Sequence, residues 1–524
     1  MICPSIFNDV IGPVMRGPSS SHCAGALRIG RLVRELMGEG GFSDVLVEFD
    51  RDGSLATTHV SQGSDMGLAG GLLGWDTADP RMVDSEKTLR ERGIKIAYLI
   101  GSYDMDHPNT YQITLTSLVE KHVVRAISSG GGMVEIISID GTDISIIGDY
   151  FETLVFTESS GISDRLFSLF NNPDFINTLQ TATGACVQIK TETVPADDII
   201  RAIGDMADVF MVRQISPVLP VRSRKELFVP FASCAQMVDY NRDKGLALSA
   251  LAVCYESNRG NLEKKDIVGQ MEEIVDIVIQ SVKSGLQGTE EDGRILGYQS
   301  GKFAEAMASG SLLGSDVLNT MTLYISSLME VKSSMGLIVA APTAGSCACL
   351  PGAVLGAVDS LGLSKDDAVR GMLAAGMIGI FIATDSTFAA EVCGCQAECG
   401  AASGMAAAAL AEMGGGSVDQ SLAAASMALQ NILGMVCDPV ANRVEVPCLT
   451  KNAMAAANAL TCANMALAGY DPVIPLDEVI KTMDTVGKSI VPELRCTARG
   501  GLSITPSARK IEEQLQSMQN KSEK

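Results

Sequence analysis

The sequence predicts an α+β protein with two major domains, a mixed α/β domain at the N-terminus and an all-α domain at the C-terminus. Three observations lead to this expectation. The 524 residues are 46% hydrophobic and only 19% charged, so the chain can bury a large core and is not disordered. Strand-like alternation, broken by Gly, Asn and Pro, is confined to roughly the first 200 residues. Helical periodicity replaces it beyond about residue 225.

The α/β domain is expected over residues 1–150. Residues 26–40 predict an amphipathic helix that ends on Gly40, because glycine is the favoured residue just past a helix C-terminus. Alternating apolar and polar residues predict four strands, over 44–50, 94–100, 111–118 and 133–140.

A smaller βαβ segment is expected over residues 151–202. Strand patterns at 151–158 and 185–192 flank a helical pattern at 163–172. This order resembles part of an ACT-type ligand-binding module. Residues 203–228 contain several prolines and a basic stretch, so they are predicted to form a linker.

Residues 229–515 are expected to form the all-helical domain, and residues 516–524 a flexible tail. Aromatic residues are only 5% of the chain, whereas 52 residues are glycine. Small side chains allow helices to approach closely, so we expect a core rich in Ala, Gly, Met and Leu.

Charge and hydropathy narrow the range of partners. The formal net charge of −22 would repel nucleic acid rather than bind it. No signal peptide is apparent before Asp9, so a cytoplasmic location is expected. Residues 337–358 are uncharged and long enough to span a membrane, but Pro342, Pro351 and many small residues favour a buried loop and helix. We therefore predict neither a nucleic-acid nor a membrane partner.

The cysteines are unevenly distributed. In an acidic chain without a secretion signal, they are expected to be thiols, metal ligands or nucleophiles rather than disulfides. Nine of the fourteen follow residue 346: Cys347, Cys349, Cys393, Cys395, Cys399, Cys437, Cys448, Cys462 and Cys496. Their spacing does not fit a compact zinc site, whereas dispersed thiolates suit an iron-sulfur cluster. Buried, unreactive cysteines are the commoner alternative.

Several motifs resemble the iron-sulfur-dependent L-serine dehydratase (L-serine ammonia-lyase) family. In the second half they are CQAE at 395–398, VCDPVA at 436–441, EVPC at 445–448, KNAM at 451–454 and RGGL at 499–502. In the first half IFNDVIGPVMRGPSSSH, AGALRIGR, GGLLGWDT, HPNT and SSGGGMVEI are similar to the β part of the same enzymes. The resemblance covers nearly the whole chain, in β-then-α order.

The resemblance implies a 4Fe-4S cluster held by three cysteines, Cys395, Cys437 and Cys448. The fourth iron would then be open and act as a Lewis acid toward the substrate. Cys393 and Cys399 are additional, either as buried thiols beside the cluster or as alternative ligands.

The same resemblance implies a set of substrate-binding residues. The loop GPSSSH precedes a helix, a position suited to a carboxylate, although a serine-rich loop alone is more often a helix cap. The implied residues are Ser19, Ser20, Ser21, His22, His107, Thr343 and Ser346.

Three departures from the family pattern fall where the substrate is expected, and one of them is ATDSTFAAEVCG at 383–394, where the family has NNASISG. Gln62 stands where family members usually have histidine, and Cys23 replaces threonine. Glutamine cannot accept a proton at neutral pH. The catalytic candidates are therefore His22 and His59 as the base, with Gln62 at the altered position.

The expected activity is that of a carbon-nitrogen lyase that converts L-serine to pyruvate and ammonia without pyridoxal phosphate. One alternative is the same chemistry on another small hydroxy or thiol acid. Another is a non-catalytic sensor of redox state or of an amino acid. The expected partners are a small amino-acid substrate and, as the family suggests, a second copy in a homodimer.

Overall fold

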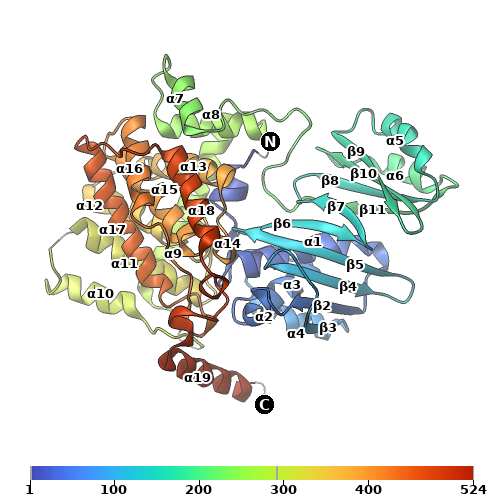
Figure 1. The fold of residues 1–524 in the computed structure, drawn as a ribbon, viewed down its shortest axis with the longest axis horizontal. Helices are drawn as coiled ribbons and strands as arrows, with labels where there is room; N and C mark the ends of the chain where they lie inside the picture. Colours follow the sequence, from blue (N-terminus) through green and yellow to red (C-terminus); the bar gives the residue numbers. More distant parts are fainter. Residues whose placement is uncertain (1–2, 291–292, 315, 523–524) are drawn as a thin grey trace.

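The computed structural model describes residues 3–290, 293–314 and 316–522. Two sheets and their helices occupy one side of the molecule, and a larger group of helices occupies the other (Figure 1). Among the described residues after 215, the only strand is β12 (Ile338–Val339). The predicted α+β class, mixed at the N-terminus and helical at the C-terminus, is confirmed.

The larger sheet has six strands in the order β3-β2-β4-β5-β6-β7. Only β2 and β3 pair in parallel, and the other neighbours are antiparallel. The four predicted strands are confirmed as β2, β3, β4 and β6, whereas β5 and β7 are additional. The strands are β2 (Asp44–Asp50), β3 (Lys95–Gly101), β4 (Thr110–Thr116), β5 (Lys121–Gly130), β6 (Met133–Ile139) and β7 (Thr142–Ile146).

One face of this sheet is covered by helices. The side chains of Val45, Val47 and Phe49 on β2 are buried and alternate with more exposed residues, as expected for a sheet with one covered face. The predicted helix over 26–40 is present as α1 (Gly25–Leu36), but its predicted end at Gly40 is wrong, because a separate 3₁₀ turn covers Gly38–Gly40. Helix α1 packs against α3 (Ser64–Leu72). The short helices α2 (Leu55–Thr58) and α4 (Ser85–Glu91) complete this layer.

Glycines let α1 and α3 approach each other closely, and we expect Gly71→Ala to destabilise the fold. A Cβ at Gly71 would lie 2.0 Å from the Leu27 carbonyl oxygen, a backbone atom that cannot rotate away. The expected loss is about 1–3 kcal/mol, visible as a lower thermal unfolding midpoint. Gly269→Ala is the control, because a Cβ there meets nothing within 4 Å, and it should leave the midpoint unchanged or raise it. An unchanged midpoint for Gly71→Ala would contradict this packing.

The second sheet is larger than the sequence predicted. Its four strands are antiparallel in the order β11-β8-β10-β9, with two helices and a small core of their own. The βαβ segment expected over 151–202 is thus a βαββαβ unit that continues to Ile215, and the predicted linker over 203–228 is wrong in its first part. The elements are β8 (Phe151–Thr157), α5 (Ser163–Leu169), β9 (Phe175–Thr181), β10 (Gly184–Thr191), α6 (Asp197–Gly204) and β11 (Val209–Ile215).

The second half consists of packed helices around α13 and α15. Most of α15 is alanine and glycine, and these small side chains let α13, α16 and α17 pack directly onto it. The helices are α7 (Cys234–Asn241), α8 (Leu248–Gly260), α9 (Lys264–Gln287), α10 (Gln299–Ala308), α11 (Asp316–Ser333), α12 (Cys349–Leu361), α13 (Lys365–Asp385), α14 (Ala390–Cys393), α15 (Cys399–Met413), α16 (Val418–Gln430), α17 (Cys448–Leu467), α18 (Leu476–Ser489) and α19 (Pro506–Ser522). Helix α19 includes residues 516–522 of the predicted tail, and residues 523–524 lie outside the described residues.

One described helix, α13, is long and apolar enough to cross a membrane by length and composition. In its most apolar window 78% of the residues are buried inside the protein, as in the core helix of a folded domain. The uncharged segment 337–358 contains a buried loop followed by α12, as the sequence analysis favoured.

The N-terminal segment joins the two halves. β1 (Val14–Met15) pairs with β12, and Ile6 packs against Gly376 of α13. The buried carboxylate of Glu256 on α8 accepts hydrogen bonds from the Ser5 hydroxyl and the Ile6 N–H. The loops that follow this segment are thereby held against the helical half.

Candidate active site

Three loops of the helical half bring cysteine thiols together. Cys395 begins a turn after α14, Cys437 follows α16, and Cys448 is the first residue of α17. The Sγ atoms of Cys395 and Cys437 and a carboxylate oxygen of Glu398 lie within 4.8 Å of one another. All three cysteines are buried. Soft thiolate ligands in this arrangement are suited to a metal.

Cys395 has the strongest thiolate character of this group. Hydrogen bonds from the Cys399 and Cys437 thiols lower the pKa of Cys395 well below the usual thiol range. Burial, together with the charge on Cys395, raises the pKa of Cys448. Burial alone would lower the pKa of Lys451. The negative charges of the neighbouring Cys395 and Cys437 have a larger combined effect and raise the Lys451 pKa. A cation therefore stands beside the thiols.

Two further cysteines extend this group. The Cys399 side chain contacts Cys395, and the Cys496 side chain contacts Cys437. Cys496 lies three residues before the motif RGGL at 499–502, and that motif gave no reason to select this cysteine. Cys393 differs, because its Sγ faces α18, 3.9 Å from a backbone oxygen of that helix.

The serine-rich loop holds His22 in a buried position. Ser19 caps the turn Ser20–Ala24, and its Oγ accepts the His22 N–H at 3.2 Å and lies 3.1 Å from His22 Nδ1. His22 Nε2 lies 2.8 Å from Thr58 Oγ1. Burial, with a smaller effect of His59, lowers the pKa of His22 to about 3. His22 is therefore neutral at physiological pH.

Contacts from this loop lead directly to the thiols. Ser20 Oγ accepts the N–H of Ala344 at 3.1 Å. The neighbouring Thr343 hydroxyl donates to Glu398 Oε1 at 2.7 Å and lies 3.2 Å from Ser346 Oγ. Glu398 in turn lies 3.9 Å from Cys395 Sγ. The predicted residues Ser20, Thr343 and Ser346 are thus brought together beside the cysteines.

Ser21 and His107 lie farther along the chain of contacts and do not reach the thiol group. Ser21 is buried, and its carbonyl accepts the Ser128 hydroxyl at 2.8 Å. His107 Nδ1 accepts the backbone N–H of Asn109 at 3.1 Å, and burial lowers the His107 pKa. His107 therefore shapes the turn that carries Asn109, rather than contacting the thiol group.

His59 and Gln62 lie on one turn that reaches the thiols from the other side. His59 Nδ1 lies 2.8 and 2.9 Å from the two carboxylate oxygens of Asp65, so this nitrogen carries the proton and donates it. The Gln62 side chain is buried and donates from Nε2 to Cys496 Sγ at 3.4 Å. Gln62 is thereby connected to Cys437 through Cys496.

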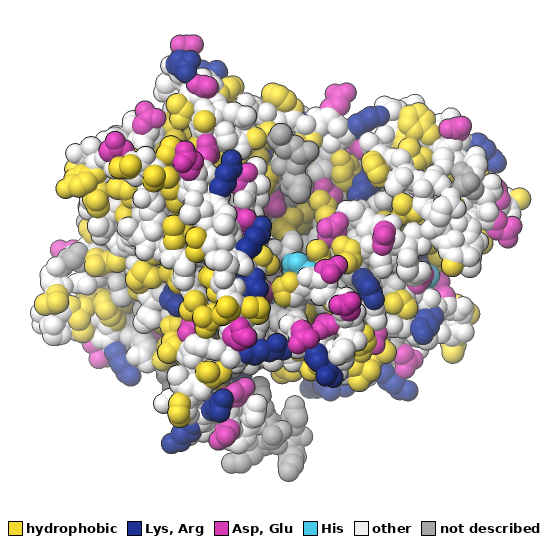
Figure 2. Space-filling view, in the orientation of Figure 1, with side chains coloured by type: hydrophobic (Ala, Val, Ile, Leu, Met, Phe, Trp, Pro, Cys, Tyr) yellow, Lys and Arg dark blue, Asp and Glu magenta, His cyan; other side chains and the backbone are white. Residues whose placement is uncertain are grey.

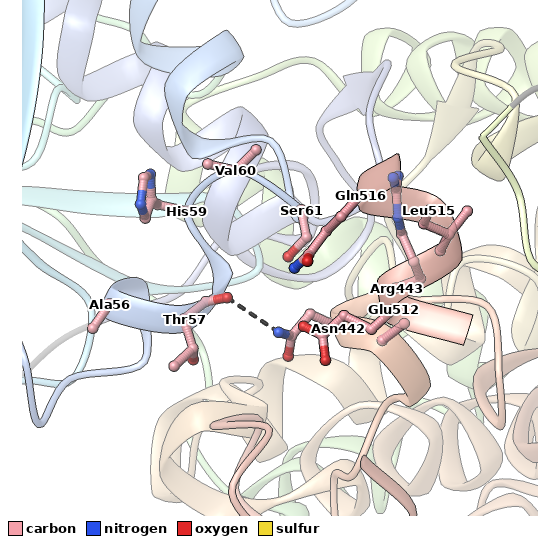
Figure 3. A pocket seen from close by; sticks show the side chains of 11 residues that line it. Ala56, Thr57, His59, Val60, Ser61, Asn442, Arg443, Glu512, Leu515 and Gln516 are labelled. Atoms are coloured by element: carbon pink, nitrogen blue, oxygen red, sulfur yellow. Dashed lines mark hydrogen bonds between the residues drawn. The ribbon is translucent and has the colours of Figure 1, made fainter. Parts of the chain in front are cut away.

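A cavity of about 300 Å³ opens beside His59. Figure 3 shows this turn facing the loop that follows Cys437, where the Asn442 amide donates to the Thr57 carbonyl at 3.2 Å. Glu512, Leu515 and Gln516 of α19 line the opposite wall. The cavity therefore lies between the two halves of the chain.

Two buried polar side chains in this region were not selected from the sequence. Glu391 lies on α14, and its Oε1 is 3.4 Å from His22 Nδ1. Asn109 is 1% exposed and lies against Glu391. Glu391 lies four residues before the motif CQAE, and Asn109 lies within the motif HPNT, but neither motif singled out these two residues.

Charged side chains of both signs are interspersed over the face drawn in Figure 2, and the surface is hollowed between the helical and the sheet-bearing halves. On the described part of this face, basic side chains do not gather into one large patch.

Comparisons with known proteins agree on one group. The family described as serine dehydratase alpha chain matches residues 243–503. The probable L-serine dehydratase alpha chain of Bacillus subtilis is 37% identical over 286 residues, covering 54% of this chain and 95% of that protein. The L-serine dehydratase alpha chain of Peptoniphilus asaccharolyticus is 36% identical over 278 residues, or 53% of this chain and 95% of that protein.

A further relative extends the similarity to the first half. The L-serine dehydratase of Streptomyces coelicolor is 28% identical over 495 residues, covering 93% of this chain and 96% of that protein. Both halves of this chain therefore have counterparts within one known protein.

Proposed function

Because this chain belongs to the L-serine dehydratase family, we propose that it converts L-serine to pyruvate and ammonia with an iron-sulfur cluster as its cofactor. The observation that carries the proposal is the convergence of two loops of the first half on one thiol group. One loop reaches the thiols where Ser20 accepts the N–H of Ala344, whose neighbour Thr343 donates to Glu398 beside Cys395. The other reaches Cys437 through Gln62 and Cys496.

The donor set fits a 4Fe-4S cluster. Cys395, Cys437 and Cys448 would hold it, since buried thiolates are the usual ligands of such clusters. When bound through three thiolates, the cluster supplies an iron of Lewis-acid character to the oxygen atoms of a substrate. Lys451 balances part of the negative charge of the site.

His59 is the residue best suited to remove the α proton. Its Nδ1–H is held by the Asp65 carboxylate, which leaves Nε2 as the nitrogen with a lone pair. Among the described residues, Nε2 makes no hydrogen bond, and the ring lines the cavity between the two halves. Neutral His22 and buried Gln62 would position the substrate rather than take its proton.

The predicted serine and threonine residues would bind the substrate's carboxylate. Ser19, Ser20 and Ser21 place hydroxyl groups at the start of a helix, where the helix dipole favours an anion. Thr343 and Ser346 add hydroxyls from the helical half. A homodimer and a cytoplasmic location stay predictions.

A substrate panel tests the proposed activity. The anaerobically purified, iron-replete protein should release ammonia and a keto acid from L-serine. L-Threonine, L-cysteine and D-serine should be slower. Activity on L-cysteine or L-threonine alone would move the proposal to another hydroxy or thiol amino acid. Silence on all four substrates with bound iron would favour a sensor.

Exposure to air should inactivate the enzyme. When three thiolates hold the cluster, the fourth iron has no thiolate ligand. That iron is accessible to oxidants and is lost on oxidation. Activity should therefore decay in air and return after ferrous iron and a thiol reductant are added under anaerobic conditions. Full activity after prolonged aeration in the presence of a chelator would indicate zinc or no metal.

A further inference from the structure

Two adjacent buried side chains each carry an oxygen atom that lacks a hydrogen-bond partner among the described residues. Glu391 is 6% exposed, and its Oε2 atom is buried with no partner among the described residues. Asn109 is 1% exposed, and the oxygen of its side-chain amide is buried with no partner among the described residues. The two side chains are in contact, because a hydrogen bond from the Asn109 amide lowers the pKa of the Glu391 carboxyl, against the larger effect of burial, which raises it. Buried polar atoms are nearly always satisfied, so an unfilled pair indicates a place for a ligand.

The surroundings of this pair are those of the proposed active site. Glu391 lies four residues before Cys395 and faces the serine-rich loop through His22, at 3.4 Å. The turn that carries Asn109 is held by His107. The close approach of Gly130 to Ala389, where a Cβ would lie 2.8 Å from the Ala389 backbone nitrogen, keeps α14 against the sheet.

The hydrogen bonds around His22 show which of its ring nitrogens carries the proton, and thus whether His22 can donate to Glu391. The Thr58 hydroxyl donates to the Ser54 carbonyl at 2.7 Å, so its oxygen accepts from His22 Nε2. The proton of neutral His22 is therefore on Nε2, and Nδ1 carries a lone pair that faces Ser19 and Glu391. His22 in this state cannot donate to the Glu391 carboxylate.

The Glu391 carboxyl therefore forms no ion pair with a basic side chain among the described residues. Among the described residues, no Lys or Arg nitrogen lies within 4 Å of its carboxyl oxygens. Burial raises the pKa of Glu391. The neighbouring carboxyl of Glu398 adds negative charge to the region rather than offsetting it. A buried carboxylate is costly unless it is paired, so a cationic ligand group would find a partner here.

We infer that Glu391 and Asn109 receive the α-ammonium group of the substrate. An ammonium group offers three donors, which match the free Glu391 Oε2 and the Asn109 amide oxygen. This inference rests on the proposed function and assigns its specificity. Glu391 selects amino acids over hydroxy acids, which have the same carboxylate but a hydroxyl where the amino acid has an ammonium.

Two small ligands that differ only in this group test the inference. L-Alanine and L-lactate have no β-hydroxyl to lose, so both can be titrated calorimetrically into the iron-loaded enzyme without turnover. The wild type should bind L-alanine at least about tenfold more tightly than L-lactate, because a hydrogen bond to a charged group is lost with lactate. Glu391→Gln should weaken L-alanine about 10- to 100-fold and change L-lactate less than about threefold.

Iron content is measured on every sample. Two further variants distinguish a loss of ammonium binding from a general loss of folding. Asn109→Ser removes the amide and should weaken L-alanine about 3- to 10-fold while sparing L-lactate. Glu412→Gln is the matched control, because Glu412 is also a mostly buried carboxyl with an unpartnered oxygen, at the far end of α15. It should leave both affinities unchanged.

The outcomes separate the inference from the proposed function. Equal weakening of both ligands in Glu391→Gln, retention of the L-alanine preference, or binding of neither ligand by the wild type would overturn the role of Glu391. A Glu391-dependent preference for L-alanine, in a protein that releases no ammonia from L-serine, would support the ammonium site and reject serine deamination.

Discussion

Replacement of Cys395, Cys437 or Cys448 by serine is expected to remove the bound iron and with it the activity on L-serine. A hydroxyl group is a poor ligand for soft iron. Cys395 and Cys437 lie in one buried group with Glu398, and buried Cys448 is near enough for the charge on Cys395 to raise its pKa. Loss of a supporting contact at a metal site already costs about 10- to 100-fold, so loss of a ligand should cost at least 100-fold. Iron analysis, the visible spectrum and ammonia release report the result.

Cys254→Ser is the control for these variants. Cys254 is also a buried thiol, but it lies on α8 and contacts the Tyr240 hydroxyl at 3.3 Å, apart from the thiol group. It should keep full iron content and activity. Normal iron content in any one of the three ligand variants would contradict the assignment of that cysteine and shift attention to Cys399 or Cys496.

His59→Asn should lower the turnover number on L-serine by about 10² to 10⁴, because the variant loses the proton acceptor. The effect should fall mainly on kcat, with bound iron unchanged, since His59 is not among the thiol contacts. Steady-state kinetics on anaerobic enzyme, together with loss of exchange of the substrate's α proton with solvent, provide the measurement.

His122→Asn controls for removal of a histidine held by an aspartate. His122 Nδ1 lies 2.7 Å from Asp140 Oδ2, a pair similar to His59 with Asp65, but on β5 away from the cavity. Its kcat should be unchanged. Gln62→His should retain or improve activity. A His59→Asn enzyme with normal kcat would exclude His59 as the base and leave His22 as the candidate.

The fold was predictable where the pattern is local. Val45, Val47 and Phe49 alternate clearly, and β2 follows from them. Strand β11 did not stand out, because its residues are half-buried and the nearby prolines suggested a linker. Only its pairing with β8, some 50 residues earlier in the chain, makes it a strand. Such long-range pairing overrides local propensity.

The candidate site also contains residues that the sequence predicted and residues that it could not predict. Cys395, Cys437 and Cys448 were found through motifs, and the structure places the first two within one ligand group. Glu391 and Asn109 could not be selected from the sequence, because what distinguishes each of them is a buried oxygen atom without a hydrogen-bond partner. That property depends on how α14, the serine-rich loop and the turn before β4 meet, which no spacing rule describes.

The most direct test of the account is to measure iron bound per chain against the rate of pyruvate formation from L-serine, in anaerobic samples loaded to different degrees. The account predicts a rate proportional to iron, vanishing without iron and reaching its maximum near about four irons and four sulfides per chain. Deamination of L-serine by iron-free protein, or full iron loading with no pyruvate formed, would contradict it.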